Sequence, residues 1–130
     1  MPTTASAPEV PTPVLDSTDQ APRLARSFLA ERFREWGIAN EYLGRLVVCE
    51  LVTNAYLHGE GPIIVRVFQD KEDDDVVIEV WDAGEGRPMI GCEDHAAMSG
   101  RGLLLMSQLV RDWGVRPLNE GGKVTWATLR

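Results

Sequence analysis

The chain has 130 residues, of which 44% are hydrophobic and 25% are charged. These values are ordinary for a globular protein, and the length predicts one domain with its own hydrophobic core. Its 20 acidic residues outnumber its 13 basic residues, which gives a formal net charge of −7. Because an acidic surface repels phosphate backbones, the charge argues against direct binding to nucleic acid and favours a basic protein surface as partner.

The first residues of the chain differ in composition from the rest. Residues 1–13 are rich in proline, threonine and alanine, which predicts a flexible tail before a single domain that spans residues 14–130. They contain no basic segment followed by an apolar one, so no signal peptide is expected. No stretch approaches the roughly 20 apolar residues of a membrane helix. Cys49 and Cys92 lack metal-site spacing and are expected as reduced thiols. We therefore expect a soluble, cytoplasmic protein without membrane contact.

Two helices are predicted in the first half of the domain. Asp16–Asp19 offers several N-cap residues, and Pro22 is tolerated in a first turn. Gly37 is expected to end this helix, and Asn40 to cap a second helix that runs to His58. The apolar side chains of the first helix are predicted to share one face: Leu24, Ala25, Phe28, Leu29 and Trp36.

The periodicity then changes to that of β-strands. Ile63–Phe68 and Val76–Trp81 flank an acidic turn, which predicts an antiparallel hairpin. Gly102–Val110 predicts a short apolar helix, and Trp113–Pro117 and Lys123–Leu129 predict two closing strands joined by the turn NEGG. Because the strands follow one another through hairpins, the order predicts an α+β fold. We expect a two-layer sandwich of a mixed, mostly antiparallel sheet with helices on one face.

The second helix carries the first candidate motif, VVCELVTNAYLHG. Glu50 and Asn54 are one turn apart and project from the same apolar sector, with His58 at its edge. A carboxylate in such a sector is costly unless it has a partner or faces a cleft. Taken alone, the pair is also explained by a backbone hydrogen bond or by two solvent-facing side chains.

The second motif is WDAGEG, which places Asp82 at the end of a strand beside Gly84 and Gly86. A carboxylate there can accept a hydrogen bond from the exocyclic amino group of a flat ligand, and the glycines let the backbone approach that ligand closely. An ordinary Asp-Gly turn is the alternative.

The third motif is SGRGLLLM, where Gly100 and Gly102 precede an apolar helix. The first N–H groups of a helix are free to bind an anion, and Arg101 adds a forked cationic donor. A loop that leads into a core helix is the alternative. Lys123, in EGGKVT, is not part of a P-loop, because the upstream glycine is missing and valine follows the lysine.

Together and in this order, the three motifs resemble those of the GHKL ATP-binding (Bergerat) fold, which gyrase, histidine kinases and MutL share. The chain is particularly similar to the small bacterial anti-sigma factor serine kinases. ELVTNAYLHG resembles the N box of that family, DAGEG the first glycine box and GRGLLLM the second. The resemblance covers the chain from about Asp16 to its last residue.

The resemblance implies a role for each candidate residue. Glu50 would be the catalytic general base that takes the proton of the attacking hydroxyl group, and Asn54 would hold a Mg²⁺ that bridges the ATP phosphates. Asp82 would accept a hydrogen bond from the adenine amino group. The other positions implied to line the nucleotide site are His58, Gly84, Gly86, Gly100, Arg101, Gly102 and Thr125.

The implied function is that of an ATP- and Mg²⁺-dependent serine/threonine protein kinase. Such a protein binds a sigma factor and phosphorylates its anti-anti-sigma (STAS-type) antagonist, and a homodimer is a further expectation from the family. One departure from the family pattern favours an alternative function. Residues 87–99 contain no lysine, whereas several GHKL ATPases use a lysine in this lid. The alternative is a nucleotide-responsive protein-binding module with little or no kinase activity.

Overall fold

The computed structural model describes residues 12–84 and 106–129. Four of the candidate residues, Gly86, Gly100, Arg101 and Gly102, lie outside these residues, as do Cys92 and the segment 87–99. Residues 106–109, the described part of the short helix predicted before the closing strands, are helical. The other elements are β1 (Val14–Leu15), α2 (Ala21–Trp36), α3 (Glu41–His58), β2 (Ile63–Gln69), β3 (Val76–Asp82), β4 (Asp112–Pro117) and β5 (Lys123–Thr128).

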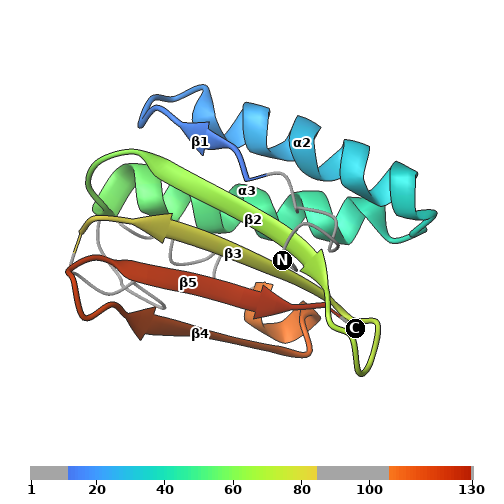
Figure 1. Ribbon diagram of the computed structural model, residues 1–130. Helices are drawn as coiled ribbons and strands as arrows, with labels where there is room; N and C mark the ends of the chain where they lie inside the picture. The colour runs from blue at the N-terminus through green and yellow to red at the C-terminus, as the bar shows by residue number, and fades with distance from the viewer. Residues whose placement is uncertain (1–11, 85–105, 130) are drawn as a thin grey trace, which may run out of the picture.

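The strands form one sheet in the order β1-β2-β3-β5-β4, and every neighbouring pair is antiparallel. Figure 1 shows α2 and α3 together on one face of this sheet. The predicted α+β sandwich is therefore confirmed, although the strands that the structure describes contain no parallel pair. β5 lies between β3 and β4. Because β3 and β5 are antiparallel, the start of β5 is beside the end of β3. The register pairs Asp82 with Lys123 and Val80 with Thr125.

The core lies between the sheet and the two helices. α2 buries Ala25, Leu29 and Phe33, which are four residues apart and so share one helix face. Gly44 brings α3 close to α2, because a Cβ atom at this position would lie 2.7 Å from the Phe33 ring. The side of the sheet that faces the helices is also apolar; its buried residues include Ile63, Val65, Val67, Ile78, Val80 and Ala127. Burying one such large side chain contributes about 1.5–3 kcal/mol.

The observed helix ends agree in part with those predicted from the sequence. Gly37 ends α2 in the left-handed conformation, with φ of 72°, and Pro22 lies in the first turn, as predicted. The N-cap of α2, however, is Gln20 and not a residue of Asp16–Asp19. Asn40 does occupy the N-cap position of α3, but its side chain makes no capping hydrogen bond.

One further expectation was wrong, and one strand was missed. Leu24 belongs to the predicted apolar face of α2, yet it is 44% exposed, because α2 is covered by the sheet and α3 on one side only. Strand β1 was not predicted, since two residues are too few to show a period. Its register, Val14 with Ile64 and Leu15 with Ile63, adds it to the edge of the sheet beside β2. None of the described helices combines the length and apolar character needed to cross a membrane.

Candidate functional site

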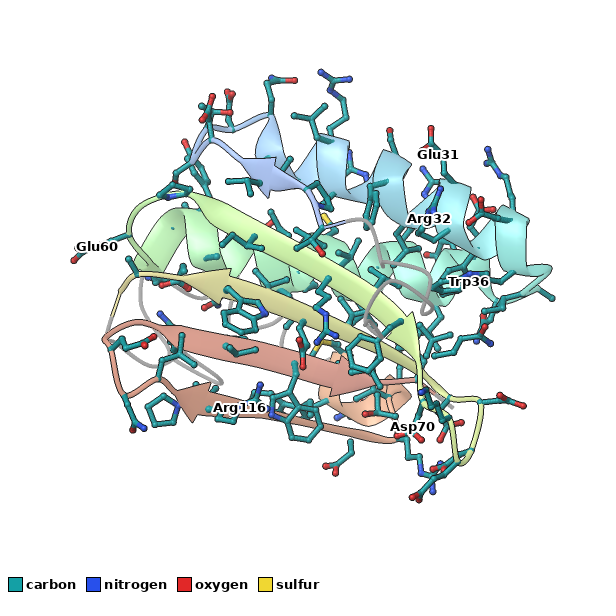
Figure 2. All side chains as sticks on the ribbon, viewed as in Figure 1. Glu31, Arg32, Trp36, Glu60, Asp70 and Arg116 are labelled. Atoms are coloured by element: carbon teal, nitrogen blue, oxygen red, sulfur yellow. The ribbon has the colours of Figure 1, made fainter. Side chains whose placement is uncertain are left out.

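Three segments far apart in the sequence meet at one end of the sheet: the end of α3, the end of β3 and the start of β5. α3 contacts both strands. Gly59, which follows α3 directly, is so close to β3 that a Cβ atom on it would lie 2.5 Å from Cγ of Asp82. The Ala83 N–H group donates to the Glu60 carbonyl oxygen at 2.8 Å, and Figure 2 marks Glu60 at this end of the molecule. The first two sequence motifs therefore converge in space.

Asp82 is the centre of this junction. Its Oδ1 atom accepts two hydrogen bonds, from the Gly84 N–H group at 2.7 Å and from the Lys123 Nζ atom at 3.0 Å. The side chains of Lys123 and Asp82 are only 5% and 2% exposed. Removing two charges from water is costly, and the pair persists because each charge compensates the burial of the other. Asp82 and Gly84 were predicted site residues, whereas Lys123 was not.

Backbone packs closely around Asp82 at three glycines, where an added Cβ atom would be crowded. A Cβ atom on Gly84 would lie 3.0 Å from the Asp82 Oδ1 atom and 3.0 Å from the Cα atom of Gly59. Gly122 has φ of 87°, and a Cβ atom on it would lie 2.5 Å from the Asp82 carbonyl oxygen. Gly59 and Gly122 were not among the predicted site residues. Their place in the sequence, next to a helix end and a strand start, was the available signal.

On α3, Asn54 and His58 carry polar atoms that have no partners among the described residues. Asn54 is 3% exposed, and neither its Nδ2 atom nor the His58 Nε2 atom has a hydrogen-bond partner within residues 12–84 and 106–129. Buried polar side-chain atoms are nearly always paired, so these two atoms, one turn apart, are available to a group outside the described residues. A carboxamide offers both an oxygen that can ligate Mg²⁺ and an N–H donor for an anion. The unpaired Nδ2 atom is a donor that can serve an anion, whereas the ligand for Mg²⁺ would be the Oδ1 atom of the same amide.

Glu50 lies one turn before Asn54 and is partly buried. Burial raises the pKa of the Glu50 carboxyl group above its ordinary value of 4.5, because desolvation disfavours the charged form. A carboxylate with a raised pKa takes up a proton more readily near neutral pH, as a general base must. The position and protonation behaviour of Glu50 are thus compatible with the role predicted for it.

Thr125 is the last predicted residue within the described part of the chain. It is buried and lies two residues after Lys123 in β5, so both side chains project from the same face of the sheet. That face is covered by the helices, since Ala127, the next residue in this alternation, belongs to the core. Asp82, which pairs with Lys123, lies on the same face. Thr125 therefore lies on the same face of the sheet as Asp82.

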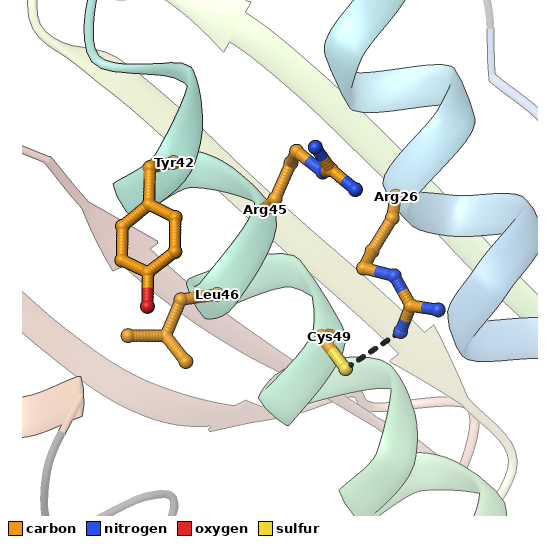
Figure 3. Close-up of a pocket in the computed structure, with 5 residues that line it drawn as sticks. All are labelled: Arg26, Tyr42, Arg45, Leu46 and Cys49. Carbon is orange, nitrogen blue, oxygen red and sulfur yellow. Dashed lines mark hydrogen bonds between the residues drawn. The ribbon is translucent and has the colours of Figure 1, made fainter.

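A separate cavity of about 250 Å³ lies on α2 and α3 and contains none of the predicted residues. Figure 3 shows its lining, in which Arg26 donates a hydrogen bond to the Cys49 Sγ atom at 3.1 Å. Cys49 is a free thiol, as expected. The lining residues are Arg26, Tyr42, Arg45, Leu46 and Cys49. The cavity offers no carboxylate or amide to a metal, so the candidate site remains the junction around Asp82.

Comparisons with known proteins agree with the fold. A family model described as a histidine kinase-like ATPase domain matches residues 15–129. The chain is also similar to the crystal structure of the RsbU and RsbW domains of Rv1364c from Mycobacterium tuberculosis, with 27% sequence identity and a TM-score of 0.65. The match covers 95% of this chain and 33% of that one, so this chain spans about a third of the neighbour's length. No curated protein matches the chain.

Proposed function

Because the chain belongs to the histidine kinase-like ATPase family, we propose that it is an ATP-dependent serine/threonine protein kinase that acts as an anti-sigma regulatory factor. Its substrate would be a serine or threonine of an anti-anti-sigma, STAS-type antagonist, and its regulatory target a sigma factor. The observation that carries the proposal is the α3 face. There a partly buried carboxylate precedes the buried Asn54 amide by one turn, and the Nδ2 atom of that amide has no partner among the described residues. The similarity to a structure that contains an RsbW domain supports the same class.

In this proposal each described residue acts on a different part of the substrates. Asp82 accepts a hydrogen bond from the adenine amino group, and Thr125 lies on the same face of the sheet beside it. Asn54 and His58 turn their unpaired atoms toward the phosphates, with Asn54 as a ligand of Mg²⁺. When bound, Mg²⁺ neutralises phosphate charge. Glu50 takes the proton of the protein hydroxyl group that attacks the terminal phosphate.

The remaining parts of the proposal rest on the sequence motifs. Gly86, Gly100, Arg101 and Gly102 would complete the nucleotide site around the sugar and phosphates, with Arg101 as the forked donor. Residues 14–130 would form the single domain and residues 1–13 a flexible tail. We also propose a cytoplasmic location, where ATP and sigma factors are found, and a homodimer, with no direct contact to nucleic acid or membrane.

The kinase proposal is tested by phosphate transfer from Mg-ATP to a purified antagonist protein. Glu50→Gln keeps the shape of the side chain but removes the base, so transfer should fall about 10²- to 10⁴-fold while nucleotide binding persists. Glu31→Gln, an exposed change on α2, is the matched control and should transfer phosphate like the wild type. Equal transfer by Glu50→Gln and wild type would reject Glu50 as the general base.

The second candidate function is a nucleotide-responsive binding module with little or no kinase activity. It is favoured by one observation, the absence of lysine from residues 87–99. Mg-ATP would then strengthen capture of the partner protein, but mass spectrometry of the captured partner would detect no phosphoserine or phosphothreonine. The same incubation therefore distinguishes the two functions. Failure of Mg-ATP to bind in calorimetry would reject both.

A further inference from the structure

The buried lysine beside Asp82 has no role in the mechanism described above. We propose that Lys123 fixes the orientation of the Asp82 carboxyl group and thereby makes the base subsite select a purine with an amino group at position 6 over one with a carbonyl group there. This inference rests on the proposed function, since it assumes that Asp82 contacts the base of a nucleotide. Lys123 is in this sense a positioning residue: it acts on the ligand through Asp82.

The first argument is the distribution of donors on the carboxylate. Both donors that reach Asp82 from the described residues, the Gly84 N–H group and the Lys123 ammonium group, bind Oδ1, at 2.7 Å and 3.0 Å. Neither binds Oδ2. The two oxygens are chemically equivalent in a free carboxylate, so the surroundings alone make them different. Oδ1 is occupied by the protein, whereas Oδ2 receives no donor from the described residues and is the acceptor that we assign to the ligand.

The second argument is that the lysine cannot easily give up this contact. Its side chain is 5% exposed, and Asp82 is its single ion-pair partner among the described residues. Strand pairing fixes its backbone directly opposite Asp82. If the carboxyl group rotated so that neither oxygen faced Lys123, a buried ammonium group would lose its acceptor, which is strongly unfavourable. The Gly84 N–H group, fixed by the close packing of Gly84 against Gly59, holds the same oxygen from a second direction.

The consequence is a subsite in which the described residues direct one fixed acceptor, Oδ2, at the base and use their two donors on Oδ1. An adenine amino group can donate to Oδ2, whereas the carbonyl oxygen at position 6 of hypoxanthine would face a carboxylate and be repelled. A hydrogen bond to a charged group contributes enough that its loss lowers affinity by about 10- to 100-fold. The protein should therefore bind ATP more tightly than inosine triphosphate, which differs from ATP at this edge of the base.

The test compares ATP with inosine triphosphate by calorimetry in the presence of Mg²⁺, for three proteins. The wild type should favour ATP by about 10- to 100-fold. In Asp82→Asn, the two donors should retain the amide oxygen at the Oδ1 position and so direct Nδ2 at the base. A donor then replaces the acceptor, and the preference should reverse in favour of inosine triphosphate. In the double variant Asp82→Asn/Lys123→Met, Gly84 alone holds the amide, so the amide can turn either way. This protein should therefore show little of the reversed nucleotide preference.

The role of Lys123 is rejected if Asp82→Asn and the double variant show the same ratio of affinities. Thermal melting of each protein checks that it is folded. If Asp82→Asn does not fold, Lys123→Met alone decides: a loss of ATP affinity with unchanged inosine triphosphate affinity supports the proposal, and an equal loss for both nucleotides overturns it. Wild-type protein that binds neither nucleotide would instead refute the proposed function. The failure of the inference and the failure of the proposed function are therefore distinguishable.

Discussion

The two ends of the sheet each hold acidic and basic side chains in contact, but in different surroundings. At the end where β3 finishes, the Asp82 and Lys123 side chains are 2% and 5% exposed. At the opposite end, near Asp70 in Figure 2, Arg111 contacts Asp73 and Asp75 of the β2–β3 hairpin, and its side chain is 53% exposed. The chemical groups are similar, so burial is the variable that separates the two ends.

The difference shows which ion pair has a structural consequence. Exposed pairs contribute about 0–1 kcal/mol, because water and salt screen them. A buried pair is different: removing one partner leaves an uncompensated charge and costs about 3–5 kcal/mol. The hairpin pair thus tolerates change, whereas the pair at the candidate site ties the ends of β3 and β5 together. A fixed Asp82 is what a selective ligand subsite requires.

The largest effect is expected from Asp82→Ala. Lys123 would remain buried without its acceptor, so the free energy of unfolding should fall by about 3–5 kcal/mol, as measured by urea denaturation. The double variant Asp82→Leu/Lys123→Met replaces the pair with apolar groups and should recover most of this loss, because buried pairs are often no more stable than well-packed hydrophobic residues. A double variant as unstable as Asp82→Ala would show that packing, and not the unpaired charge, causes the loss.

The next largest effect is expected from Gly122→Ala, which tests the backbone around the same carboxylate. The new methyl group would combine an unfavourable positive φ with a contact of 2.5 Å to the Asp82 carbonyl oxygen. Left-handed strain costs about 1–2 kcal/mol and overpacking about 1–3 kcal/mol. Gly37→Ala is the matched control, because Gly37 has φ of 72° with nothing within 4 Å of the added Cβ. It should show the strain alone, and equal losses for the two variants would contradict the predicted clash.

The contrast between the ends also explains what the sequence could predict. The Glu50–Asn54–His58 face follows from helical periodicity, and the place of Asp82 follows from the end of a strand, since both are local patterns. Lys123 was considered only as part of a P-loop, which the missing upstream glycine and the following valine excluded. Its contact with Asp82 was not predicted, because that partner lies 41 residues earlier in the chain. Finding that pair requires knowing that β5 lies beside β3, and with which register.

Other differences between the predictions and the structure also arise from contacts between distant parts of the chain. Gly59 and Gly122 matter because of segments that approach them from elsewhere in the chain, which their neighbours in sequence do not reveal. The exposure of Leu24 depends on how much of α2 the sheet and α3 cover. Local patterns thus predicted the candidate site residues, whereas the residues that pack against them depend on tertiary contacts.

A smaller effect is expected from Arg111→Ala at the exposed end. Losing its contacts with Asp73 and Asp75 should lower the free energy of unfolding by less than about 1 kcal/mol. The loss should shrink further at high salt, because salt screens exposed charges. Urea denaturation at low and high salt measures both quantities. A loss comparable to that of Asp82→Ala would show that the hairpin pair is not screened as its exposure indicates.

The smallest change in the free energy of unfolding is expected for Glu50→Gln, and this change is an increase. Glu50 differs from both the buried pair at Asp82 and the exposed contacts of Arg111. It is a partly buried carboxyl group without a hydrogen-bond or ion-pair partner among the described residues. Its pKa in the folded protein is raised above the ordinary 4.5 by desolvation, so the folded state binds the proton more tightly than the unfolded state. The resulting stabilisation is complete below pH 4.5 and is lost as pH rises through the raised pKa.

Near neutral pH the wild type therefore retains an unfavourable carboxylate that Glu50→Gln lacks. Because the side chain is only partly buried, screening keeps the difference below about 1 kcal/mol, or about 1–3 °C in Tm. The variant should melt higher than the wild type at neutral pH, and the difference should close as pH falls below 4.5. Equal Tm values at neutral pH would mean that other groups in the folded protein offset the cost of burying the Glu50 carboxylate. A stabilised variant that no longer transfers phosphate would show that this position trades stability for chemistry.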